Sequence, residues 1–162
     1  MVQAYDNVHR DKDGWVSLID IKEEMKMLDT EFASSDYQNT RRLAEKVILL
    51  TETFPSGIIE VDEKLDSKPV IHHIRIDTDT FRFIEAYKQA PIREQGGWVL
   101  LTYIGQELKK RLAYENGFTY HGVKKSQLLK FVNEIVQAYP KFIKIRKKTN
   151  GKSEIYRVRV KL

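Results

Sequence analysis

Apolar residues in the first half of the chain recur at spacings that predict a definite order of elements. Over residues 1–8 they fall at every third position, which predicts a short helix. Residues 15–17 are predicted to form a small strand after a polar turn, and the Ser17 hydroxyl can cap a second helix. The core face of that second helix is predicted to contain Leu18, Ile21, Met25 and Leu28.

A third helix and a hairpin complete the first half. The helix is predicted over residues 37–53 and ends at Phe54-Pro55, because proline does not continue a helix. Runs rich in β-branched residues at 58–61 and 70–76 bracket the polar segment 62–69, so they are predicted to pair as a hairpin. The inward residues of the third helix are predicted to be Leu43, Val47 and Leu50.

The second half repeats this order of helices. Helical spacing over residues 79–95 predicts an opening helix that Pro91 ends. Another helix is predicted over residues 122–139, closed by Tyr139-Pro140. Between these two helices, a further core stripe contains Ile104, Leu108 and Leu112.

A second hairpin is predicted at the end of the chain. Strands at 142–146 and 154–160 flank a basic loop, and Asn150-Gly151 within it is typical of a tight turn because both positions tolerate positive φ. The matching loop of the first half, residues 62–66, is acidic. The two hairpins are therefore alike in form and opposite in charge.

The two halves are also related residue by residue. Gly97-Trp98-Val99 repeats Gly14-Trp15-Val16 at an offset of 83 residues, and residues 155–160 answer residues 71–76 at an offset of 84. The order of helix, short strand, helix, turn, helix and hairpin is typical of a winged helix-turn-helix domain, with an unrelated small α+β domain as the alternative. The fold class is therefore α+β, with two tandem domains predicted at residues 1–78 and residues 79–162.

The composition of the chain argues against several classes of protein function. Hydrophobic residues make up 41% and charged residues 31% of the 162 residues, as in a soluble globular protein. The chain has no cysteine, no apolar run of about 18 residues and no recognisable signal peptide, so a cytoplasmic location without a membrane span is expected. Because it also lacks a phosphate-binding glycine loop, metal-ligand spacing and a nucleophile motif, we expect neither catalysis nor a cofactor or metal.

Charge separates the two copies. Residues 1–78 hold 10 basic and 16 acidic side chains, a formal charge of −6, whereas residues 79–162 hold 18 and 7, a charge of +11. Nucleic acid is a polyanion, so the second copy is the candidate to bind it. Seven cations on the second hairpin are predicted to contact phosphates: Lys144, Arg146, Lys147, Lys148, Lys152, Arg157 and Arg159.

Further candidates lie around the third helix of each copy. Lys124 and Lys125 begin that helix in the second copy, where free N–H groups already favour a phosphate. Arg41 and Arg42 are their expected equivalents in the first copy. Their acidic surroundings, Asp36 and Glu45, favour ion pairing there over contact with nucleic acid.

Aromatic residues offer a second kind of contact. Tyr120 and His121 could stack on an unpaired base, although a packing role is favoured because Tyr37 occupies the matching place in the acidic copy. Trp15 and Trp98 are predicted to anchor the two cores, since burying so large a side chain is strongly stabilising.

Several of these motifs together form a recognisable pattern. The first copy contains Asp13-Gly14-Trp15-Val16, Leu28-Asp29-Thr30-Glu31-Phe32 and, after Tyr37, Arg41-Arg42-Leu43. The second contains Gly97-Trp98-Val99 and, after Tyr120, Lys124-Lys125; Leu112–Phe118 takes the place of the L-D-x-x-F motif, and Ser126 stands where Leu43 predicts an apolar residue. The pattern resembles the LOTUS domain, also called the OST-HTH domain.

The resemblance implies small winged helix-turn-helix modules of RNA-regulating proteins. Some members of the family bind RNA, including structured or G-rich RNA, some dock onto RNA helicases, and bacterial members often accompany a NYN-type nuclease domain. Three hypotheses therefore stand: a non-catalytic RNA-binding module, an adaptor whose acidic first copy docks a helicase or nuclease, and a DNA-binding protein. The third would read base edges with residues such as Gln127, Lys130 and Asn133.

Overall fold

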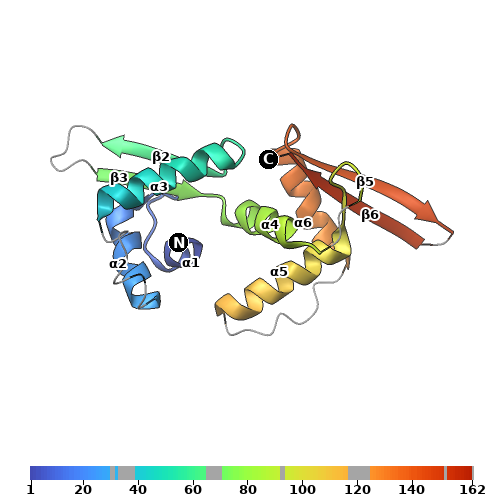
Figure 1. Ribbon diagram of the computed structural model, residues 1–162, viewed down its shortest axis with the longest axis horizontal. Helices are drawn as coiled ribbons and strands as arrows, with labels where there is room; N and C mark the ends of the chain where they lie inside the picture. The colour runs from blue at the N-terminus through green and yellow to red at the C-terminus, as the bar shows by residue number, and fades with distance from the viewer. Residues whose placement is uncertain are drawn as a thin grey trace. The chain divides into compact units, whose positions relative to one another are not determined.

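The computed structural model describes residues 1–29, 32, 39–64, 71–91, 94–116, 125–151 and 153–161. The chain divides into two compact units, Met1–Thr78 and Asp79–Leu162, and each is mixed α+β. Figure 1 shows the elements along the chain.

The first unit places a small antiparallel sheet beside three helices. Its sheet has the strand order β1-β3-β2, with Val16 opposite Ile74 and Val61 opposite the same Ile74 on the other side. These apolar residues face inward, and Ile74 is fully buried. The elements are α1 (Val2–Asn7), β1 (Val16–Ser17), α2 (Leu18–Leu28), α3 (Thr40–Thr53), β2 (Ile59–Lys64) and β3 (Ile71–Ile76).

The second unit has the same order of elements. Its sheet order is β4-β6-β5, and Val99 and Ile145 flank Val158 as Val16 and Val61 flank Ile74 in the first unit. The β5–β6 hairpin extends beyond the helices of its own unit (Figure 1). The elements are α4 (Thr78–Gln89), β4 (Val99–Leu100), α5 (Leu101–Asn116), α6 (Lys125–Ala138), β5 (Ile143–Asn150) and β6 (Ser153–Val160).

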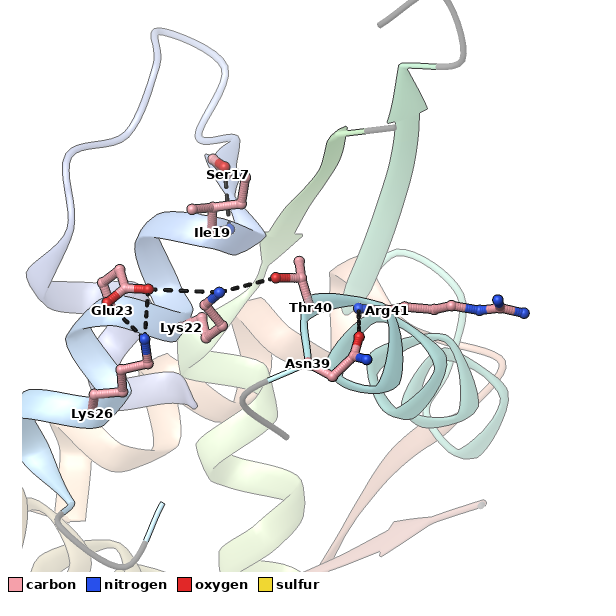
Figure 2. A network of polar contacts seen from close by, with 8 residues as sticks. All are labelled: Ser17, Ile19, Lys22, Glu23, Lys26, Asn39, Thr40 and Arg41. Carbon is pink, nitrogen blue, oxygen red and sulfur yellow. Dashed lines mark hydrogen bonds and ion pairs between the residues drawn. The ribbon is translucent and has the colours of Figure 1, made fainter. Parts of the chain in front are cut away.

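Side-chain caps fix where the helices of the first unit begin. The Ser17 hydroxyl accepts a hydrogen bond from the Ile19 amide at 3.2 Å, which confirms its predicted role at the start of α2. The Asn39 side chain accepts from the Arg41 amide at 2.9 Å, so α3 begins at Thr40 (Figure 2). The predicted start of that helix, Tyr37, lies outside the described residues.

Three local predictions were wrong. Leu28, expected in the core, is 43% exposed at the end of α2. Asn150 does not enter the turn of the second hairpin but pairs with Ser153 as the last residue of β5, so the turn begins at Gly151, whose φ is 59°. Lys147 and Lys148 therefore lie in a strand and not in a loop, because the ladder continues through these polar residues.

The core of each unit is closed by a tyrosine. Tyr5 and Tyr87 are each 2% exposed, and each donates a hydrogen bond from its hydroxyl, at 2.6 Å, to the carbonyl of Gly14 or Gly97 respectively. Both glycines have positive φ, 84° and 76°, which glycine adopts without steric cost. The same contact thus fixes the turn before β1 and the turn before β4.

Candidate nucleic-acid interface

The second sheet gathers four cations on one of its faces. In the β5–β6 ladder Lys144 lies opposite Arg159 and Arg146 lies opposite Arg157. Opposite residues of an antiparallel ladder share a face, and so do residues two apart along a strand. The alternate residues, such as Ile143 and Val158, are buried in the core. Lys144, Arg146, Arg157 and Arg159 therefore form one outward surface, here called the basic face.

Trp98 covers part of the basic face and does not anchor the core. The guanidinium carbon of Arg146 lies 4.2 Å from the centre of the Trp98 ring, and that of Arg159 lies 5.0 Å from it. Trp15 is likewise only partly buried and lies 5.2 Å from the guanidinium carbon of Arg75. The prediction that the tryptophans anchor the cores was wrong, because cationic side chains cover them from the solvent side.

An acidic residue that sequence reasoning missed lies against this surface. Glu94 accepts a hydrogen bond from Arg157 Nε at 2.5 Å through one carboxylate oxygen and from Arg146 at 2.9 Å through the other. The hydrogen bond from Arg157 is the main reason that the pKa of Glu94 is lowered, and the charge of Arg146 adds to it. Two of the four cations therefore already share an internal anion.

The internal repeat could have identified Glu94, because Asp11 is the equivalent acidic residue of the first unit at the offset of 83. The Glu94 amide donates to the Trp98 carbonyl at 2.7 Å, just as the Asp11 amide donates to the Trp15 carbonyl at 3.0 Å. Asp11 uses its carboxylate locally and accepts from the amides of Asp13 and Trp15; the hydrogen bond from Trp15 is the main reason that its pKa is lowered. Glutamate at the equivalent position is one methylene longer, and its carboxylate contacts the arginines of the sheet.

The remaining hairpin cations divide between the two faces. Lys147 forms an ion pair with Glu154, and Tyr156 donates a hydrogen bond to the same carboxylate at 2.7 Å. The bond to Glu154 raises the pKa of Lys147 and that of Tyr156. Lys148 is exposed and lies in line with Arg146 on the outward side. Lys152 lies outside the described residues.

The structure describes some of the other candidate residues and not the rest. Lys124, Tyr120 and His121 lie outside the described residues, and Lys125 is the first residue of α6. Arg41 pairs with Glu45 at 3.1 Å while remaining 86% exposed, which confirms the expected intramolecular pair. Arg42 is exposed on the same turn of α3.

The expected equivalence between the basic pairs of the third helices was wrong. Both α3 and α6 contain 14 residues, so their starts and ends correspond at an offset of 85. Leu43 then corresponds to Leu128, which removes the mismatch at Ser126, and Thr40 corresponds to Lys125. Figure 2 shows Thr40 accepting a hydrogen bond at 3.0 Å from Lys22 of α2. In the first unit this hydrogen bond joins the start of the third helix to α2.

A pocket of about 1080 Å³ adjoins the basic face within the second unit. Arg157 belongs to both, and the pocket is lined by charged, polar and apolar side chains from α4, α5, α6 and β6. The apolar lining includes Leu101, Leu108, Leu128 and Phe131.

Comparison with known proteins assigns no function to this site. In the described part of the chain, no helix is both long enough and apolar enough to cross a membrane. Searches against protein-family models, curated proteins and solved structures found no match for this chain.

Proposed function

We propose that this chain is a non-catalytic RNA-binding module made of two LOTUS-like winged helix-turn-helix domains, whose basic second domain holds the phosphate backbone. One observation carries the proposal: Lys144, Arg146, Arg157 and Arg159 lie on one sheet face beside a partly exposed tryptophan. Cations in such an array neutralise phosphates and release counterions, which favours binding at low salt. The repeated order of elements supports the winged-helix assignment.

The mode of binding follows from the kind of side chain on this face. In this proposal the arginine and lysine side chains contact the sugar–phosphate backbone, and such contacts carry no information about base sequence. Arg146 and Arg159 cover the Trp98 ring in the free chain, and phosphates that draw these guanidinium groups away would expose the ring for stacking of an unpaired base. Single-stranded RNA is therefore the preferred ligand in this proposal, and binding should depend little on sequence.

The test titrates the full chain against single-stranded, duplex and G-rich RNA and against DNA of matched sequence, at two salt concentrations. We expect the affinity for RNA to fall steeply with salt, and Arg146→Gln to weaken it. Arg41→Gln removes an exposed arginine from the acidic unit and should change little. Binding that ignores salt, or an equal loss in both variants, would contradict the proposal, and a preference for duplex DNA would favour a DNA-binding protein.

A second candidate is a protein adaptor, and one observation favours it. Met27 is 75% exposed and Leu28 43% exposed at the end of α2, and Leu49 of α3 is 55% exposed. Large apolar side chains on an acidic unit suit a protein partner better than a polyanion. In this alternative the partner is an RNA helicase or a NYN-type nuclease. Capture of such an enzyme that survives nuclease treatment and is lost in Met27→Lys would support it.

A further inference from the structure

The hairpin ladders of the two sheets have the same register, but one equivalent position is acidic in the first unit and basic in the second. In the first unit Glu60 lies opposite Arg75, and in the second Lys144 lies opposite Arg159. Both residues of each pair are separated from their counterparts by 84 positions. Since the ladders share their register, the carboxylate of Glu60 is replaced by an ammonium group at the same place.

In the first unit Glu60 and Arg75 form a hydrogen-bonded ion pair. Glu60 accepts hydrogen bonds from Arg75 Nε at 2.6 Å and from a second nitrogen of the same guanidinium. The guanidinium also lies over the Trp15 ring. The arginine is thus fixed by an aromatic ring and by a carboxylate that accepts two of its protons.

In the second unit Arg159 lies over the Trp98 ring in the same way but faces a cation. Its Nε is buried and has no hydrogen-bond acceptor among the described residues. Glu94 does not supply one, because its two oxygens accept from Arg157 and Arg146. A buried donor without an acceptor and two neighbouring like charges both disfavour the folded state, and a bound anion would relieve both.

We propose that Lys144 and Arg159 form a phosphate site in the second unit, at the place where Glu60 holds Arg75 in the first. The ligand is an internucleotide phosphate of RNA, so the site rests on the RNA-binding function proposed above. Residues two apart on a strand are about 6.6 Å apart, close to the spacing of successive phosphates in a polynucleotide. Lys144, Arg146 and Lys148 form such a row on β5, which favours a polyanion over an isolated phosphate.

Lys144→Glu tests the site because it rebuilds the pair of the first unit. We expect the variant to fold, as the first unit does with its Glu60–Arg75 pair, and to lose about one unit of the salt slope of RNA binding, the value for one phosphate contact. Lys141→Glu makes the same change of charge at an exposed turn residue before β5 and should keep the slope. Equal behaviour of the two variants would overturn the proposed site.

A second measurement separates the site from the function. The Nε–H signal of Arg159 in nitrogen-correlated NMR spectra should shift when inorganic phosphate is added to the wild-type chain, and should not respond in Lys144→Glu. If the wild-type chain bound no RNA but showed this phosphate response, the RNA function would be wrong and the anion site right. If Arg159 responded to neither phosphate nor RNA, the site would be wrong.

Discussion

At the scale of single residues, a tyrosine and not the tryptophan is buried beside the glycine turn of each unit. Tryptophan has the larger apolar surface, so it was expected in the core, yet Tyr5 and Tyr87 are the buried aromatics that close each unit. A tyrosine can be buried when its hydroxyl finds an acceptor, and here the glycine carbonyl of the next turn provides one. The pattern of apolar residues contains no information about that carbonyl.

We predict that Tyr87→Phe lowers the free energy of unfolding of the second unit by about 1 kcal/mol, because the Gly97 carbonyl loses its donor. Each unit contains one tryptophan, so Trp98 fluorescence in a Trp15→Phe background follows the second unit during denaturation. Tyr5→Phe is the matched control and should leave the Trp98 transition unchanged. An unaltered midpoint for Tyr87→Phe would show that the hydrogen bond contributes nothing.

Glu94 gives a prediction about pH. The folded state lowers its pKa, so the carboxylate stabilises the fold above the ordinary glutamate range, and this contribution is lost as the pH falls through the lowered value. The free energy of unfolding of the second unit should therefore fall on acidification within that window. In Glu94→Gln the fall should be shallower. Denaturation followed by Trp98 at a series of acidic pH values measures this, and identical pH profiles would contradict it.

At the scale of elements, the periodic pattern predicted the helices and strands better than their ends. Ser17 caps α2 as expected, since a hydroxyl before an apolar run is a strong local signal. The start of α3 and the end of β5 depended on other information. Asn39 sets the start of α3 through its side chain, and Gly151 lets the ladder of β5 run on to Asn150. Polar residues in a strand that continues past its core carry no periodic signal.

Alanine substitutions at two glycines test whether the turns have the conformations described above. Gly97 and Gly151 both have positive φ, so alanine at either should cost about 1 kcal/mol in backbone strain. A Cβ at Gly97 would also lie 3.4 Å from the Tyr87 hydroxyl, whereas at Gly151 no described atom lies within 4 Å. Gly97→Ala should therefore be the more destabilising variant in the Trp98 unfolding assay. The reverse order would mean that the turn before β4 is not fixed by Tyr87.

At the scale of the whole molecule, charge is distributed by unit and then by face. The sequence was sufficient to predict the formal charges of the two halves, −6 and +11, and the cations of the second hairpin. Their gathering on one face required the register that pairs Lys144 with Arg159 and Arg146 with Arg157. The anion that tempers them comes from a loop 52 residues before Arg146, and no local pattern connects the two.

The last prediction asks whether RNA binding follows the net charge of the chain or the charge of the basic face. Glu94→Gln and Asp62→Asn each add one positive charge, but Glu94 contacts Arg146 and Arg157 while Asp62 is an exposed strand residue of the first unit. We expect Glu94→Gln to raise the affinity for single-stranded RNA about fivefold at low salt, the effect of about 1 kcal/mol from one charge at close range. Asp62→Asn should change it little. Fluorescence anisotropy with a labelled oligouridylate measures both. If the two variants gained equally, net charge would govern binding; if Glu94→Gln bound more weakly, Glu94 would serve to position the arginines and not to compete with phosphate.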